Sequence, residues 1–353
     1  MSPARSGERL GRLRAALPLP CETVAWLALA ARGLVVRGNG LNLDMVTVRY
    51  TVPPMLRPTA VGLLSGIALY ALFQALRRRP VRPYLRTVIS AAWWTLGLRI
   101  WVVCLVLTYT YMWLKVSVPL INYRLWDEQL WSLDRIVHFG ISPSIFWREL
   151  LAGSGLLPWI DRWYGLWTSS ITLAVGFFCA APEAATRRRV MLSTVLLWVL
   201  GSWIYLALPA VGPAYVRPEV WDGVREEMPA SQNAQAALWR NYQRVLEGRE
   251  GELRAFKPAY GVAALPSLHV AGHFLLLLWI RRWARPLLVP AVLAVTATFV
   301  GSVVTGWHYA VDGYLGIALA WGVDRLALYG DRVLDPSSGG DASEVTAEPP
   351  ARA

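Results

Sequence analysis

The chain has 353 residues, of which 55% are hydrophobic and only 16% are charged. A soluble protein of this length rarely carries so many long apolar runs, so the composition excludes an ordinary globular domain and predicts an all-α protein that crosses a membrane several times. The net charge of +12 does not predict nucleic-acid binding, because the basic residues gather in short segments between the apolar runs, as membrane topology requires.

Seven segments approach or exceed the roughly 20 apolar residues that a membrane span needs. They lie at 59–76, 87–114, 160–180, 190–208, 267–280, 287–305 and 308–328. A further segment, 17–36, carries Glu22 and Arg32, and we expect it to span the membrane or to lie at its interface. These segments divide the chain into an N-terminal segment (1–58), the first clear spans (59–114), a core (115–330) and a polar tail (331–353) that we expect to be disordered.

Arginines predict the orientation of the spans. Segment 77–86 holds five arginines and no acid, 187–189 is Arg-Arg-Arg, and 281–285 holds three more. All three fall on one side if every segment spans, and the positive-inside rule makes that side cytoplasmic. Loops 115–159 and 209–266 then lie outside, which predicts a multi-pass protein of the plasma membrane.

Both outer loops contain a predicted amphipathic helix. Residues 232–246 carry Ala234, Leu238, Tyr242 and Val245 at helical spacing, which favours a helix on the membrane surface or over a site as a lid. Residues 124–138 follow a similar pattern. Their apolar positions are Leu125, Leu130, Leu133 and Ile136, and their acids are Asp127, Glu128 and Asp134.

Two short motifs place ionisable residues at the ends of apolar segments. They are Pro-Ser-Leu-His-Val-Ala-Gly-His at 266–273 and Gly-Trp-His-Tyr-Ala-Val-Asp-Gly at 306–313. Ionisable groups in membrane segments are costly to bury, so they indicate function. His308 and Asp312 are four residues apart and would share one face of a helix, where Asp312 could hold one imidazole N–H and leave the other nitrogen free. The predicted topology opens both motifs toward the outer side.

The first motif supplies a second histidine beside a helix start. Pro266 and Ser267 suit the first turn, where the serine can cap free N–H groups, and such a start favours an anion such as phosphate. His269 would lie in that turn, able to give a proton to a leaving oxygen. Together the motifs predict phosphoryl transfer in which one imidazole attacks phosphorus and the other acts as the acid.

Ser-Leu-His at 267–269 followed by His308-x-x-x-Asp312 resembles the type 2 phosphatidic acid phosphatase (PAP2) superfamily, in the inositolphosphotransferase-like branch related to fungal inositol phosphorylceramide synthase. Segments 130–143 and 212–215 are similar to that branch as well. The resemblance implies a six-helix membrane core with one or two extra N-terminal helices. It also implies a phosphohistidine formed on His308, an orienting Asp312, His269 as general acid and then base, membrane-lipid substrates, and no metal or cofactor.

Two cations of the superfamily pattern are absent from their usual positions. Ala210 stands where a lysine precedes Arg217-Pro218, and Gly301-Ser302 stands where Ser-Arg precedes the second histidine. The favoured branch lacks these cations too. We expect Ser267, Arg217, Arg254 and Lys257 to bind the substrate, and the reaction to move a phosphoryl-linked head group between lipids.

Three alternatives remain open. A simple phosphatase acting on phosphatidic acid or polyprenyl phosphate would use the same residues. His269, His273, His308 and Asp312 could instead hold zinc in a membrane hydrolase, because pairs at i and i+4 on a helix are good chelates. A lipid transporter with a buried polar site would need no chemistry. For His273 a structural role is favoured, and His138 is expected to be incidental.

Overall fold

The computed structural model describes residues 18–41, 45–247 and 261–334, and over these ranges the chain is built from helices, with no strand. The prediction of an all-α polytopic membrane protein is confirmed. Four helical segments are long and apolar enough to cross a membrane: Met55–Leu76, Ala91–Ile121, Ala184–Ala207 and Arg285–Val304.

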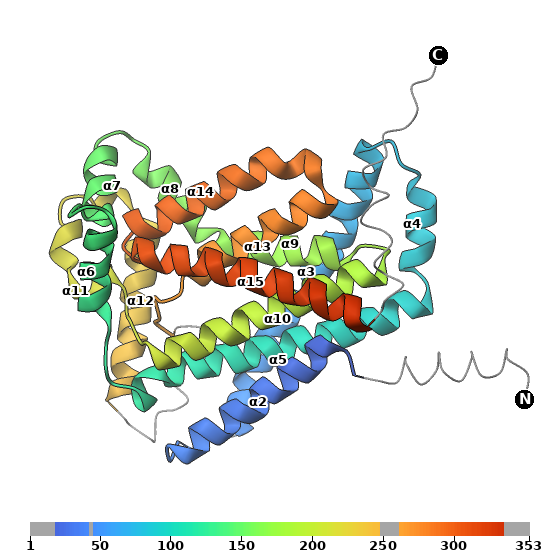
Figure 1. Cartoon of the computed structure of the whole chain (residues 1–353), viewed down its shortest axis with the longest axis horizontal. Helices are drawn as coiled ribbons and strands as arrows, with labels where there is room; N and C mark the ends of the chain where they lie inside the picture. The colour runs from blue at the N-terminus through green and yellow to red at the C-terminus, as the bar shows by residue number, and fades with distance from the viewer. Residues whose placement is uncertain (1–17, 42–44, 248–260, 335–353) are drawn as a thin grey trace, which may run out of the picture.

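The helices follow the predicted order along the chain (Figure 1). They are α2 (Pro20–Gly38), α3 (Met45–Leu76), α4 (Val81–Val88), α5 (Ala91–Ile121), α6 (Asp127–Val137), α7 (Pro143–Leu151), α8 (Leu157–Gly165), α9 (Trp167–Cys179), α10 (Ala184–Ala207), α11 (Pro213–Val216), α12 (Pro229–Leu246), α13 (Leu268–Trp283), α14 (Leu288–Val304) and α15 (Ala310–Leu334).

Several predicted boundaries differ from those of the structure. The span expected at 160–180 is broken between α8 and α9, next to Leu166, and α9 by itself is only 13 residues long. The boundary drawn at residue 58 falls inside α3, and α15 continues to Leu334. The rest of the predicted tail lies outside the described residues.

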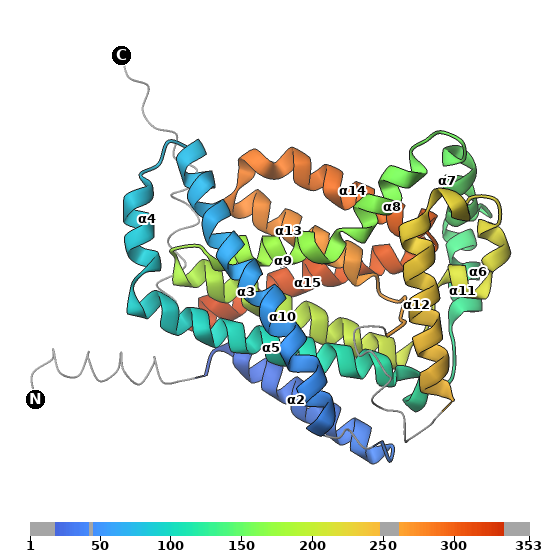
Figure 2. The same cartoon turned by 180° about the vertical axis from the view of Figure 1, so that it is seen from behind.

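The long helices run between two ends of the molecule. Helices α6, α7, α11 and α12 gather at one end, and α4 lies at the other (Figures 1 and 2). The α4 end carries the arginines of segment 77–86, while the opposite end is formed by the two loops predicted to lie outside. The Arg187–Arg189 run forms the beginning of α10 and not a loop, and Arg187 is buried against the Trp93 ring at 4.1 Å.

Two ion pairs join charged residues of different helices in the bundle. Arg99 of α5 makes a bidentate ion pair with Glu22 of α2, with N–O distances of 2.7 and 2.6 Å. Arg282 at the end of α13 pairs in the same way with Asp324 of α15, at 3.0 and 2.8 Å. Paired charges cost far less in a low-dielectric environment than isolated ones, so each pair fixes two helices against each other.

Glycines allow α3 to cross α9 closely. A Cβ on Gly66 would clash with the backbone of Gly176, and a Cβ on Gly176 would clash with that of Gly62. Small residues four apart commonly let membrane helices approach in this way. The crossing therefore attaches the N-terminal helix α3 to α9, in the middle of the chain.

Helix α6 buries its acidic residues together with Leu130 and leaves the rest of its apolar pattern exposed. Asp127, Leu130 and Asp134 are buried, whereas Leu133 and Ile136 are 44% and 73% exposed. The reason is that the two carboxylates accept hydrogen bonds from backbone N–H groups at the starts of other segments. Leu133 and Ile136 therefore lie on the outer face of the helix, where a helix at the membrane surface carries its apolar residues.

We expect the two ends to lie on opposite sides of the membrane. In an otherwise wild-type protein, Ala230→Cys at the start of α12 should react with an impermeant thiol reagent in intact cells, whereas Ala184→Cys at the start of α10 should not. Both alanines are exposed, and the native Cys21 and Cys179 are buried. The unsubstituted protein gives the background from native cysteines. Labelling of Ala184→Cys but not of Ala230→Cys would show that the protein has the opposite orientation in the membrane.

Candidate active site

The two histidine motifs meet at the end of the bundle that carries α6, α11 and α12. Ser267 is the N-cap of α13, as predicted, and its side chain accepts a hydrogen bond from the N–H of Val270 at 3.4 Å. Its own N–H donates to the backbone carbonyl of Asp312 at 2.9 Å. This bond joins the start of α13 to the first turn of α15, and so brings the motifs together.

The imidazoles of His269 and His308 lie in direct contact. Nδ1 of His269 and Nε2 of His308 are 3.2 Å apart, and the ring planes are nearly perpendicular. His308 is buried, with 3% exposure, and His269 is half-buried. The two candidates therefore share one site, as the equal depth of their motifs predicted.

The hydrogen bonds of His308 fix its tautomer. Its Nδ1 lies 2.8 Å from the backbone carbonyl oxygen of Ala264, which can only accept, so Nδ1 carries the proton. Nε2 of the neutral ring then holds a lone pair that faces His269. A proton on Nδ1 of His269 would be donated to this lone pair, and the same nitrogen also contacts the hydroxyl of Tyr164.

Asp312 has a different first partner from the one expected. Its Oδ2 is 3.5 Å from Nδ1 of His308 but accepts a 2.9 Å hydrogen bond from the N–H of Tyr309. The difference arises because His308 precedes α15 and does not lie on the helix, so Asp312 folds back to cap the turn. Asp312 is fully buried beside His308, and its Oδ1 has no hydrogen-bond partner among the described residues.

Two carboxylates of α6 fix the backbone around His308. Asp134 accepts hydrogen bonds from the N–H groups of Ala310 and Val311 at 2.9 and 2.8 Å, which begins α15 immediately after the histidine. Burial raises the pKa of the Asp134 carboxyl, and these two donors oppose that rise. Asp127 similarly binds the N–H groups of Val211 and Gly212 and the hydroxyl of Tyr309.

The loop before α15 packs against the segment that begins at Gly212. Gly212 has a φ of 101°, and a Cβ there would lie 2.6 Å from the carbonyl oxygen of Trp307. Gly306 has a φ of 76° and accepts a 3.0 Å hydrogen bond from the N–H of Ala214. Both positions require glycine, which agrees with the segment singled out at 212–215.

Helix α12 covers the same loop, in agreement with the predicted lid. Asp161 of α8 accepts hydrogen bonds from the N–H groups of Ala230 and Ser231, both at 2.8 Å, and so anchors the start of α12. The Gln235 amide donates to the Thr305 carbonyl at 2.8 Å, and the Trp307 indole N–H donates to the Ser231 hydroxyl at 3.4 Å. The lid is therefore held by polar contacts on both sides.

The remaining predicted residues divide into three groups. Arg217 is engaged by Glu128 at 2.6 Å and lies over the Trp131 ring at 5.3 Å. Arg254 and Lys257 lie outside the described residues. His273 turns away from the other histidines, because its Nε2 is 2.9 Å from the hydroxyl of Ser170 and its Nδ1 bonds the carbonyl of His269.

His273 therefore does not join the zinc constellation that the spacing allowed. Within residues 18–41, 45–247 and 261–334, no group of three or more His, Cys, Asp or Glu side chains is arranged to hold a metal ion.

His138 also makes defined contacts and is not incidental to the fold. It ends α6, its Nδ1 bonds the Asp134 carbonyl at 2.6 Å, and its Nε2 bonds the Tyr314 hydroxyl of α15 at 3.0 Å.

Lys115 of α5 is a cation near the histidines that the sequence analysis did not single out. It stands beside Tyr111, the first ring of a series that continues through Trp198 and Trp167 to His269. It sits 5.8 and 5.5 Å from the ring centroids of Tyr111 and Tyr205, and no carboxylate of the described residues pairs with it. An ionisable residue at the end of an apolar span was the only signal for it in the sequence.

The profile of the PAP2 superfamily matches residues 128–325, which is more than half of the chain. The chain therefore belongs to the PAP2 superfamily, a group of lipid phosphatases and phosphotransferases. The match includes both histidine motifs and leaves α2, α3 and α5 outside it. Searches of curated proteins and of solved structures give no significant match.

We expect Lys115 to contribute a positive charge to phosphate binding. Lys115→Met should lower kcat/KM for phosphatidic acid, used as a test substrate, by about 10- to 100-fold, the usual range for losing a hydrogen bond to a charged group. Lys115→Arg should keep part of the activity because it keeps the charge. Arg217→Met is the matched comparison. A large loss in Arg217→Met, with Lys115→Met unaffected, would identify Arg217 as the phosphate-binding cation.

Proposed function

We propose that this protein is a membrane phosphotransferase that moves a phosphoryl-linked head group between lipids through a phosphohistidine on His308. The observation that carries the proposal is the arrangement of the two imidazoles. Nε2 of His308 has a lone pair, because Nδ1–H is bound to the carbonyl of Ala264, and it faces Nδ1 of His269 across 3.2 Å. An imidazole with a free lone pair beside a second imidazole that can carry a proton supplies a nucleophile and a general acid.

In the first step Nε2 of His308 forms a bond to phosphorus while the bond from phosphorus to the leaving oxygen breaks. His269 gives its proton to that oxygen. In the second step His269 takes the proton of an acceptor hydroxyl, whose oxygen bonds to phosphorus as the N–P bond breaks. The two nitrogens must move apart first, because a reacting phosphoryl group does not fit between atoms 3.2 Å apart.

The neighbouring residues support these roles in different ways. The Ala264 carbonyl orients His308, and the Asp312 carboxylate, 3.5 Å from Nδ1, favours the positive charge that develops on the ring. Ser267 contributes the start of α13 to phosphate binding. Lys115, with Arg217, Arg254 and Lys257 as the residues proposed from sequence, supplies positive charge.

The covering helix α12 favours transfer to a lipid or polyol hydroxyl over transfer to water. Gln235 and Ser231 attach α12 to residues 305 and 307, directly before His308. A site closed in this way can exclude water from the phosphohistidine. The activity is most like that of the inositolphosphotransferase branch. We place the enzyme in the plasma membrane with its site facing the extracytoplasmic side, following the arginine distribution.

We expect His308→Ala to abolish turnover of a phospholipid substrate with unchanged expression, because the covalent step is lost. Asp312→Asn should lose less, since Ala264 still holds the imidazole N–H. The measurement is the rate of product formation by purified variants, with formation of an acid-labile, base-stable protein phosphate as an independent readout. More than a few per cent of wild-type activity in His308→Ala would remove it as the nucleophile.

The acceptor can be identified by incubating purified protein with radiolabelled phosphatidylinositol or phosphatidic acid, with and without ceramide or diacylglycerol. The transferase proposal expects a labelled lipid product that depends on the added acceptor. Phosphate release that is indifferent to acceptor would instead identify a lipid phosphate phosphatase using the same histidines. A protein that binds the labelled lipid without converting it, in all mixtures, would favour the transporter.

A further inference from the structure

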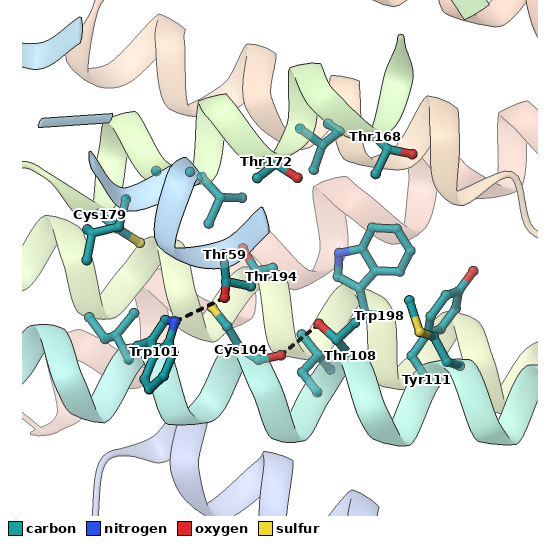
Figure 3. Close-up of a pocket in the computed structure, with 18 of the residues that line it drawn as sticks. Thr59, Trp101, Cys104, Thr108, Tyr111, Thr168, Thr172, Cys179, Thr194 and Trp198 are labelled. Carbon is teal, nitrogen blue, oxygen red and sulfur yellow. Dashed lines mark hydrogen bonds between the residues drawn. The ribbon is translucent and has the colours of Figure 1, made fainter. Parts of the chain in front are cut away.

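A cavity of about 250 Å³ lies within the bundle, between helices α3, α5, α9 and α10 (Figure 3). It runs beside α5 from Gly97 to Met112, which is 15 residue steps, or about 22 Å at 1.5 Å per residue. This length exceeds half of the roughly 30 Å hydrocarbon core of a membrane. The cavity is therefore long enough for a hydrocarbon chain of a lipid from one leaflet.

The residues that line the cavity are mostly apolar and carry no charge. Its lining contains no Asp, Glu, Lys, Arg or His. Several threonine hydroxyls in the wall are already used: Thr59 accepts from the Trp101 indole at 3.0 Å, and Thr108 donates to the Cys104 carbonyl at 2.7 Å. A wall without charged groups, in which several hydroxyls are already hydrogen-bonded, favours hydrocarbon over a polar ligand.

One end of the cavity reaches the histidine pair. Trp167 lines the cavity, and its ring centroid lies 4.1 Å from that of His269. The Trp198 ring continues the wall beside Trp167, with 6.3 Å between the two ring centroids. The Tyr111 ring follows, with its centroid 4.9 Å from that of Trp198. Figure 3 shows Tyr111, Trp198 and Thr168 together at this end, with Cys179 at the other.

A positive charge stands at the same end. The Lys115 ammonium lies 5.8 Å from the centroid of the Tyr111 ring, one turn further along α5. An apolar cavity with a cation and two imidazoles at one end is complementary to an amphiphile with an anionic phosphate head. Charge and polarity thus orient the occupant, with the head at the histidines and the chain toward Cys179.

We propose that this cavity binds one hydrocarbon chain of the lipid whose phosphate reacts at His308, an inference that rests on the function proposed for that site. Helices α3 and α5, which supply much of the wall, lie outside the segment matched by the superfamily profile. The N-terminal part of this chain would then determine the preferred chain length of the substrate, while the matched segment carries the reacting groups.

The activity test fills the cavity and varies the substrate chain. Thr108→Trp places a large ring in the cavity, and Val102→Trp places the same ring on the exposed side of α5 as a control. Removing two methylenes from an apolar site costs about tenfold in affinity. Thr108→Trp should therefore lower kcat/KM for dioleoyl phosphatidic acid at least tenfold more than for dioctanoyl phosphatidic acid. Val102→Trp should leave this ratio unchanged.

A binding test separates the cavity from the chemistry. Purified full-length protein is irradiated with phosphatidic acid carrying a diazirine in its acyl chain, and the labelled peptides are mapped by mass spectrometry. Labelling within the cavity walls of α5 and α9, lost in Thr108→Trp and competed by unlabelled phosphatidic acid, supports the inference even if no lipid is turned over. Two results together would overturn the cavity proposal while the proposed reaction stands. They are turnover of lipid with labels confined to the exposed helix faces, and a Thr108→Trp variant whose ratio of kcat/KM for dioleoyl to dioctanoyl phosphatidic acid is unchanged.

Discussion

Buried carboxylates that bind pairs of backbone N–H groups hold the reactive end of this protein together. The first N–H groups of a helix have no partner within the helix, and an unsatisfied one is costly away from water. Asp134 satisfies the start of α15, Asp127 the segment before α11, and Asp161 the start of α12. Each bond to a charged acceptor contributes about 1.5–3 kcal/mol. The position of His308 and of its covering helix follows from these three anchors.

Residue 210, where the superfamily pattern places a lysine, has a structural role in this protein. Ala210 is buried, and its carbonyl accepts a hydrogen bond from the N–H of Ala264, whose own carbonyl holds His308. The backbone at residue 210 thus supports the orientation of His308. The lysine on the side of the imidazoles is Lys115, which comes from α5 and not from position 210. In our proposal Lys115 supplies the charge that the superfamily pattern places elsewhere.

The N-terminal helices are integrated with the core and do more than extend it. Glu22 of α2 neutralises Arg99 of α5, so a charge within one apolar segment is paired with a charge within another. The glycine crossing of α3 and α9 forms one side of the cavity that ends at Trp167. Helices outside the matched segment therefore shape the space next to the histidines, which is where our proposal places a chain of the lipid substrate.

The sequence by itself determined the all-α membrane class, four of the seven predicted spans, and the meeting of His269 with His308 at one end. Apolar length and loop charge are local properties, so they can be read along the chain. Only the tertiary structure decided that α6 turns its carboxylates inward, that Ala264 and not Asp312 binds the imidazole N–H, and that Lys115 approaches both histidines. These features depend on partners 44 to nearly 200 residues away. For α6 and His308 the partners are backbone N–H and C=O groups, which leave no pattern in the sequence, and for Lys115 they are side chains brought close only by the packing of distant helices.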